Sequence, residues 1–229
     1  TIRRVINSKS NDVSTMVSNT LKGIFCYTVF FKNHISISFL MAYIRHICTF
    51  IKVDVSNESS VDALFEESSK IGTVSLVINN AGLGIFSKIE DSSVEDWDAQ
   101  INVNLRGSFL VSRKYIPSMQ EQKSGTLVFM NSVAGNFGYP YSAAYVASKF
   151  GLRGLSDSLR NELRKDKIKV ISVHPGAINT AFWDDINVDF PREEMLTPEA
   201  IAASVVHATE APDATVIENL TIRSVGGDF

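Results

Sequence analysis

The chain has 229 residues and a mass of 25.2 kDa, and its 22 basic and 25 acidic residues give a net charge of −3. That length suits one large α/β domain or two small ones. The mildly acidic balance argues against nucleic acid or an anionic membrane as the main partner. Two cysteines exclude a disulfide framework, and 45% apolar with 21% charged residues exclude a disordered chain. We therefore expect a soluble, cytoplasmic globular protein.

Residues 1–52 differ in composition from the rest of the chain. They contain seven basic residues and one acidic residue, a net charge of +6, whereas residues 53–229 carry −9. A membrane anchor is one interpretation, but the longest apolar run, Ile35–Ile44, is too short to span a bilayer. A nucleic-acid arm is a second, but the basic residues are scattered. The sequence favours a third, in which an aberrant segment occupies the start of the fold, for instance after a shifted reading frame upstream of about residue 50.

From Thr49 onward, apolar runs of strand length alternate with longer segments of helical period. Strands are expected in a run ending at Asp54 and Val55, and at Val74–Asn80, Thr126–Ser132, Ile168–His174 and Thr215–Val225. Helices are expected from Ser56-Asn57-Glu58 to about Lys70, from a capping box at Ser92 and Glu95 to about Gln122, and from about Ala144 to Lys165. This order predicts right-handed βαβ crossovers and a single-domain, doubly wound α/β fold with a parallel sheet covered on both faces.

Tyr145 and Lys149 are four residues apart at the start of a predicted helix, so their side chains share one face. A phenol with a pKa of about 10 is a poor base at neutral pH, but a nearby ammonium lowers that pKa. Such a pair can donate a proton to a carbonyl oxygen or accept one from an alcohol. On its own the spacing is also typical of a solvated helix surface.

Two further polar residues stand where they can assist this pair. Ser132 ends a predicted strand thirteen residues before Tyr145, and its hydroxyl can orient a substrate oxygen or simply satisfy a turn. Asn104 lies within the long predicted helix, where asparagine is a poor helix former. It is either a satisfied core amide or part of a proton relay behind Lys149.

The remaining candidates follow strand ends, which is where doubly wound sheets bind ligands. Asn79-Asn80-Ala81-Gly82 offers small and amide residues where a cofactor ribose would pass. Pro175-Gly176 can turn the chain beneath a planar ring, and Thr180 adds a hydroxyl. Asp54 can accept a hydrogen bond from an adenine amino group. Each has an ordinary turn interpretation, but their conjunction in this order favours a site.

From about Lys52 to Phe229 the chain resembles the short-chain dehydrogenase/reductase family, with its Rossmann-like fold. The matching stretches are Asp54-Val55, Asn79-Asn80-Ala81-Gly82, Asn102-Val103-Asn104, Ser132, Tyr145-Val146-Ala147-Ser148-Lys149, and Pro175-Gly176 with Thr180. The resemblance implies a catalytic tetrad of Asn104, Ser132, Tyr145 and Lys149, with Lys149 also binding the nicotinamide ribose. It further implies that Asp54 and Val55 flank adenine, that Asn80 lines the ribose side, and that Thr180 binds the carboxamide.

The N-terminal segment departs from the family pattern. Members of the family begin with a strand and a glycine-rich turn, whereas Val5–Val17 contains no glycine. Glycine matters there because side chains would collide with the pyrophosphate or forbid positive φ. The first strand-turn-helix unit is therefore left open, and so is the choice between NADP and NAD, with NADP slightly favoured.

The sequence predicts an NAD(P)-dependent oxidoreductase that acts on a carbonyl or secondary alcohol, with Tyr145 as acid/base. The alternative is a non-catalytic relative whose altered start impairs dinucleotide binding. Aromatic residues in Gly135–Tyr141 and Ala181–Thr197 favour an apolar or aromatic substrate, or serve only as packing. By analogy with the family we expect a homodimer or homotetramer, no nucleic-acid or membrane partner, and no metal site.

Overall fold

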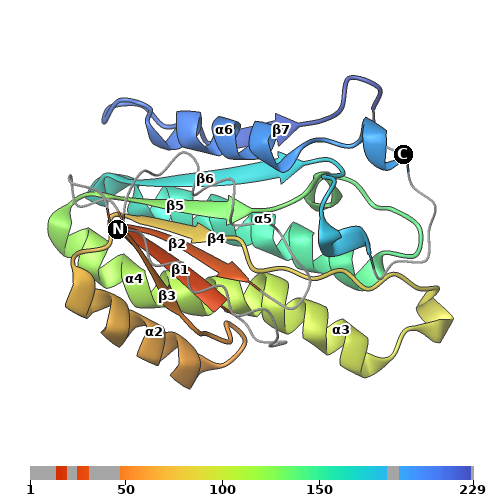
Figure 1. The fold of residues 1–229 in the computed structure, drawn as a ribbon, viewed down its shortest axis with the longest axis horizontal. Helices are drawn as coiled ribbons and strands as arrows, with labels where there is room; N and C mark the ends of the chain where they lie inside the picture. Colours follow the sequence, from red (N-terminus) through yellow and green to blue (C-terminus); the bar gives the residue numbers. More distant parts are fainter. Residues whose placement is uncertain (1–13, 20–24, 31–46, 185–190, 228–229) are drawn as a thin grey trace.

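A computed structural model of the chain describes residues 14–19, 25–30, 47–184 and 191–227. Its sheet has the strand order β3-β1-β2-β4-β5-β6-β7. The strands are β1 (Ser14–Asn19), β2 (Phe25–Phe30), β3 (Ile47–Ile51), β4 (Leu76–Asn79), β5 (Gly125–Met130), β6 (Ile168–Pro175) and β7 (Asn219–Ile222). The pairs from β2 through β4, β5 and β6 to β7 are parallel, whereas β1 is antiparallel to both neighbours. Figure 1 shows β4 to β7 side by side and pointing the same way.

Helices connect these strands, as the alternation predicted. The longer ones are α2 (Glu58–Ile71), α3 (Val94–Gln100), α4 (Ser108–Gln122), α5 (Ala143–Leu163) and α6 (Pro198–Thr209). A π-helical turn, Ile101–Gly107, joins α3 to α4. Parallel strands with helical crossovers confirm the doubly wound, Rossmann-like α/β class. In the described part of the chain, no helix combines the length and apolarity that a bilayer crossing requires.

Alternation along the strands divides the core into two layers. Leu127 and Phe129 of β5 pack with α2, α4 and α5, whereas Val128 packs on the opposite face with α6. On β6, Val170 faces the first layer and Ile171 the second. Side chains of successive strand residues point to opposite faces, so both faces of the sheet are buried. This fixes the register of β5 and β6 and thereby the position of the residues that follow them.

The structure corrects several sequence-based boundaries. The helix expected from Ser92 begins after Ser93, whose hydroxyl accepts a hydrogen bond from the Asp96 amide. Helix α6 was not predicted, although Thr197 caps it and Pro198 stands at its first position, a strong start pattern. Strand β3 ends before Asp54, and β4 and β7 are shorter than expected. The glycine-free stretch Val5–Val17 lies largely outside the described residues.

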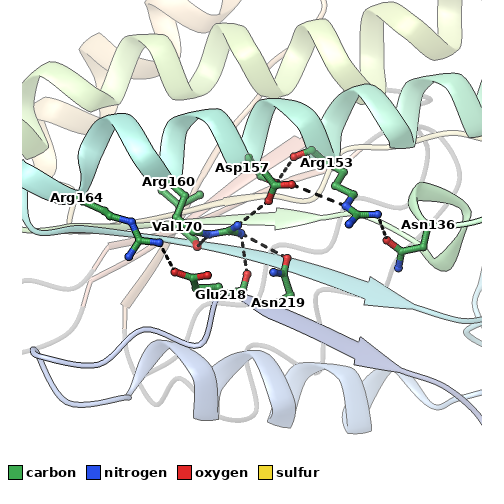
Figure 2. A network of polar contacts seen from close by, with 9 residues as sticks. Asn136, Arg153, Asp157, Arg160, Arg164, Val170, Glu218 and Asn219 are labelled. Atoms are coloured by element: carbon green, nitrogen blue, oxygen red, sulfur yellow. Dashed lines mark hydrogen bonds and ion pairs between the residues drawn. The ribbon is translucent and has the colours of Figure 1, made fainter.

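A buried arginine fastens α5 to β6 and β7 (Figure 2). Arg160 donates from Nε to the Val170 carbonyl at 3.1 Å and from Nη2 to the Glu218 carbonyl at 2.9 Å. Its Nη1 contacts Asp157 Oδ1 at 2.6 Å, and the residue is buried. Because its acceptors include a carbonyl of β6 and the carbonyl just before β7, this guanidinium holds the sheet edge against the helix that carries Tyr145 and Lys149.

Replacing Arg160 should destabilise the fold. We expect Arg160→Met to lower the free energy of unfolding by about 2–4 kcal/mol, because buried acceptors lose charged donors. The matched control is Arg164→Met, since Arg164 pairs with Glu218 at 2.6 Å while 56% exposed. Removing that exposed pair should cost about 1 kcal/mol or less. Equal losses in the two variants, measured by urea denaturation, would contradict the assigned role of Arg160.

Candidate active site

A cavity of about 500 Å³ lies at the carboxyl ends of β4, β5 and β6. Parallel strands end at one edge of the sheet, so residues distant in sequence meet there. Eight of the residues predicted from the sequence line the cavity, namely Asn80, Gly82, Ser132, Tyr145, Lys149, Pro175, Gly176 and Thr180. The structure thus brings most of the predicted site together.

Helix α5 presents Tyr145 and Lys149 to this cavity from its first turns. The Lys149 Nζ lies 5.6 Å from the centroid of the Tyr145 ring and donates a 2.9 Å hydrogen bond to the Met130 carbonyl. Lys149 is buried, and Met130 is the last residue of β5. The i, i+4 spacing therefore places both groups on one helix face, against the end of β5.

Burial shifts the two pKa values in opposite directions. It raises the pKa of the Tyr145 phenol to about 12, and a hydrogen bond from the Ser132 side chain opposes that rise. It lowers the pKa of the Lys149 ammonium to about 8. Desolvation disfavours the charged form of each group. Burial therefore raises the phenol pKa instead of the lowering expected from Lys149, and Tyr145 is protonated at neutral pH.

Ser132 lies between the end of β5 and a 3₁₀ turn, Val133–Gly135. Its Oγ accepts a 3.1 Å hydrogen bond from the Ala134 amide, so its hydroxyl proton is left to be donated elsewhere. A side-chain hydrogen bond joins this hydroxyl to the Tyr145 phenol and favours a lower phenol pKa. The hydroxyl and the phenol thus converge, as the sequence predicted.

Asn104 sits within the π-helical turn and is fully buried. Its Nδ2 donates to the Leu83 carbonyl and to Ser148 Oγ, both at 2.9 Å, and its Oδ1 accepts from the Leu83 amide at 2.9 Å. It therefore clamps the segment after β4 onto α5. Gln100, which sequence reasoning missed, accepts from the Ile85 amide at 3.0 Å. Gln100 stands four residues before Asn104, and this i, i+4 spacing is the sequence pattern that could have revealed Gln100.

Three aromatic rings form a wall beside Tyr145. The ring of Phe86 lies 5.6 Å from Tyr145 and is stacked at 6.3 Å on Trp183, with an interplanar angle of 6°. Phe182 meets Phe86 and Trp183 edge-on, at 6.2 and 5.2 Å. A β-carbon on Gly84 would lie only 2.5 Å from the Phe182 ring, so a glycine is needed there. Phe182 and Trp183 were anticipated, but nothing in the sequence pointed to Phe86.

The turn after β6 holds this wall in place. Thr180 caps a 3₁₀ turn, Ala181–Trp183, and accepts a 3.4 Å hydrogen bond from the Phe182 amide. The Trp183 indole donates to the Ile178 carbonyl at 2.9 Å. Arg192 donates to the Thr180 carbonyl at 2.7 Å and contacts Asp184 at 2.5 Å. The Thr180 hydroxyl and the aromatic wall are therefore fixed by one local network.

Three predicted cofactor residues do not line the cavity. Asp54 Oδ1 accepts hydrogen bonds from the Ser56 amide at 2.9 Å and the Ser56 hydroxyl at 2.7 Å, which forms a local turn before α2. Val55 is buried in the core, and a β-carbon on Gly107 would touch it at 2.8 Å. Ala81 packs against the same core. Their contacts serve the fold rather than the cavity.

The cavity fits the nicotinamide half of a dinucleotide. A β-carbon on Gly82 would lie 3.5 Å from Asn104 Oδ1 and 3.8 Å from Lys149 Nζ, so this glycine leaves space beside the ammonium. Lys149 offers donors for ribose hydroxyls and Thr180 a hydroxyl for the carboxamide. The described residues contain no group of three or more His, Cys, Asp and Glu side chains that could hold a metal ion.

Comparisons with known proteins agree with this geometry. The family model described as short chain dehydrogenase matches residues 37–190. A sepiapterin reductase of Chlorobaculum tepidum is 36% identical over 180 residues, which cover 78% of this chain and 73% of the relative. An alcohol dehydrogenase of the archaeon Thermococcus sibiricus, solved with 5-hydroxy-NADP, has 29% identity and a TM-score of 0.69 over 76% of this chain and 73% of that one. A metagenomic short-chain oxidoreductase solved with NADP has 29% identity and a TM-score of 0.65, covering 76% of this chain and 72% of its own.

The buried ammonium predicts a pH-dependent stability. The pKa of Lys149 is about 8 in the folded state and 10.5 ordinarily, so the wild-type protein should gain stability as pH rises from about 8 to 10.5. Lys149→Met removes this gain. The stability of Lys149→Met relative to wild type should therefore fall by about 2 kcal/mol between pH 7.5 and 9.5.

Chemical denaturation at the two pH values measures this difference. Lys88→Met serves as the control, because it removes an exposed lysine instead of a buried one. If the stability difference between Lys149→Met and the wild-type protein is the same at both pH values, the Lys149 ammonium is not desolvated.

Proposed function

Because this chain belongs to the short chain dehydrogenase family, we propose that it is an NAD(P)-dependent oxidoreductase that interconverts a carbonyl compound and a secondary alcohol, with Tyr145 as the acid/base. The observation that carries this proposal is the convergence of the Tyr145 phenol, the Ser132 hydroxyl and the Lys149 ammonium in one cavity. NADP is favoured over NAD, since both of the solved relatives described above hold NADP or a derivative.

In the mechanism, a protonated Tyr145 donates its phenolic proton to the carbonyl oxygen as negative charge develops there. Ser132 donates a hydrogen bond that holds this oxygen beside the phenol. Lys149 stabilises the resulting phenolate, and Asn104 keeps the segment after β4 in place. A bound nicotinamide dinucleotide supplies the hydride, and Asn80, Gly82, Lys149 and Thr180 are the residues that would hold its nicotinamide half.

Removal of the phenol hydroxyl should abolish turnover. We expect Tyr145→Phe to lower kcat by about 10²–10⁴-fold, the contribution typical of a positioned acid/base, with little change in melting temperature. The matched control is Tyr115→Phe, which removes a buried phenol hydroxyl that contacts Ser68 at 2.9 Å, far from the cavity. Retained turnover in Tyr145→Phe would refute the assignment.

Cofactor binding distinguishes the enzyme from the alternative, a non-catalytic relative with impaired dinucleotide binding. Titration with NADPH and NADH, followed by fluorescence from Trp97 and Trp183, should saturate at micromolar concentration in the wild-type protein and in Tyr145→Phe alike. Absence of saturation with either dinucleotide would favour the non-catalytic alternative instead.

The aromatic wall supports an apolar or aromatic carbonyl substrate. Rings of Phe86, Phe182 and Trp183 stand next to the phenol that would protonate the carbonyl oxygen. A planar ring on the substrate can stack there, and such contacts contribute about 0.5–1.5 kcal/mol beyond the area they bury.

Truncation of this wall should affect aromatic substrates selectively. We expect Trp183→Ala to raise KM for acetophenone by about 10-fold, because ring stacking and buried apolar area are lost. The rise for 2-butanone, which has no ring, should be at most about threefold and serves as the internal control. Steady-state kinetics on both ketones measures the ratio, and an equal rise for both would argue that Trp183 only supports the fold.

We further infer a homodimer or homotetramer. Large apolar side chains remain exposed on α3, α4 and α5, namely Val94, Trp97, Phe109 and Phe150. Exposed apolar side chains gathered on neighbouring helices are typical of an association surface. These are the helices through which the family resemblance implies that copies associate.

A further inference from the structure

A buried histidine lies directly behind the serine of the proposed site. His174 is the second-last residue of β6 and is only 1% exposed. Its Nδ1 lies 3.2 Å from the carbonyl oxygen of Ser132. It therefore joins the end of β6 to the residue that follows β5, and the mechanism derived above gives it no role.

The chemistry of this contact fixes the tautomer of the imidazole. A carbonyl oxygen can only accept a hydrogen bond, so His174 Nδ1 must carry a proton. Burial is the largest influence on His174 and lowers its pKa, so the ring is neutral at neutral pH. The charged side chains that influence it all belong to α5, namely Lys149, Arg153 and Asp157. The ring is thus a neutral imidazole that donates from Nδ1.

This contact completes the restraint of Ser132. The Ser132 carbonyl also accepts from the Gly135 amide at 2.9 Å, and the Ser132 amide donates to Asn131 Oδ1 at 2.9 Å. The Asn131 amide in turn donates to the Val173 carbonyl at 2.8 Å, immediately before His174. Every backbone polar group of Ser132 is therefore fixed, and the end of β6 supplies part of that restraint.

We propose that His174 is a positioning residue, whose Nδ1–H donates to the Ser132 carbonyl and thereby holds the Ser132 hydroxyl toward Tyr145. This inference rests on the proposed function, because it assigns His174 an effect on the step that Ser132 and Tyr145 perform. Without this hydrogen bond, rotation of the Ser132 peptide would turn the hydroxyl away from the phenol. His174 acts only through Ser132, because none of its atoms touches the substrate. A misplaced Ser132 hydroxyl lowers kcat more than it changes substrate or cofactor binding.

Two substitutions test the hydrogen bond against simple packing. His174→Leu removes the donor, and we expect kcat to fall about 10- to 100-fold with KM and NADPH affinity nearly unchanged. His174→Asn places an amide N–H near the former Nδ1 position and should recover most of that loss. Ser172→Ala is the control, because Ser172 is buried two residues earlier on the same strand face and its Oγ has no hydrogen-bond partner among the described residues. It should leave kcat unchanged.

Equal kcat in His174→Leu and wild type would overturn the proposal, and so would equal impairment of the Leu and Asn variants. Equal impairment would indicate that the ring acts only by filling space. Melting temperatures, recorded alongside, separate loss of folded protein from loss of rate.

A second measurement does not depend on turnover. Long-range ¹H–¹⁵N spectra of histidine-labelled protein report which ring nitrogen carries the proton, and loss of one set of signals in His174→Asn assigns the residue among the four histidines. We expect the Nδ1–H form, and an Nε2–H form would overturn the proposal. If the wild-type protein reduces no ketone with either dinucleotide, the proposed function fails, whereas this spectrum still decides whether the donor exists.

Discussion

The site depends on one constraint, which is that a phenol and an ammonium are both held away from water in the same cavity. Tyr145 and Lys149 are held in one cavity by the start of α5, and burial favours the neutral form of both. When burial shifts two pKa values in opposite directions, one group can serve as the acid and the other as the stabilising charge near neutral pH. In the proposed reaction, the phenol is the acid and the ammonium is the charge. The rest of the architecture serves to bring the ends of β4, β5 and β6 around these two side chains.

The π-helical turn is the structural device that links this pair to the segment after β4. A regular helix from residue 94 to 122 would carry Asn104 on a different face, because one extra residue in the turn rotates everything that follows. With the turn, Gln100 and Asn104 both reach the backbone of Leu83 and Ile85. Asn104 also reaches Ser148 on α5, so three elements meet at one amide. These contacts are those of a satisfied core amide, and the role of Asn104 in a proton relay stays a prediction.

Local patterns predicted much of the site, whereas contacts between distant elements escaped them. Tyr145 and Lys149 follow from the i, i+4 spacing, and Ser132 from its place at a strand end. Asp54 was also expected at a strand end, but β3 ends at Ile51, and Ser56 binds the Asp54 carboxylate in a local turn. The role of Phe86 depends on the turn after β6, nearly a hundred residues away, and no periodicity records such a contact.

The predictions of secondary structure also succeeded where the pattern is local and failed where it depends on distant contacts or a subtle shift. Amphipathic period and capping gave α2 and α5 nearly in full, because those patterns are local. The π-helical turn was not foreseen, since a single-residue shift leaves the apolar period of a long helix almost intact. Antiparallel β1 also departs from the all-parallel expectation, and its place follows from pairing with β2 and β3 rather than from its own residues.

The raised phenol pKa also fixes the protonation state from which the proposed reaction starts. At neutral pH Tyr145 holds its proton, which is the form needed to protonate a carbonyl oxygen during reduction. Alcohol oxidation needs the phenolate, which burial disfavours, which the Ser132 hydrogen bond favours, and which the proposed role of Lys149 would further support. Because the ammonium itself loses its proton at a pH of about 8, its support weakens at the alkaline pH where the phenolate would form. The two pKa shifts together therefore leave a protonated phenol at neutral pH, which is the state from which the proposed reduction starts.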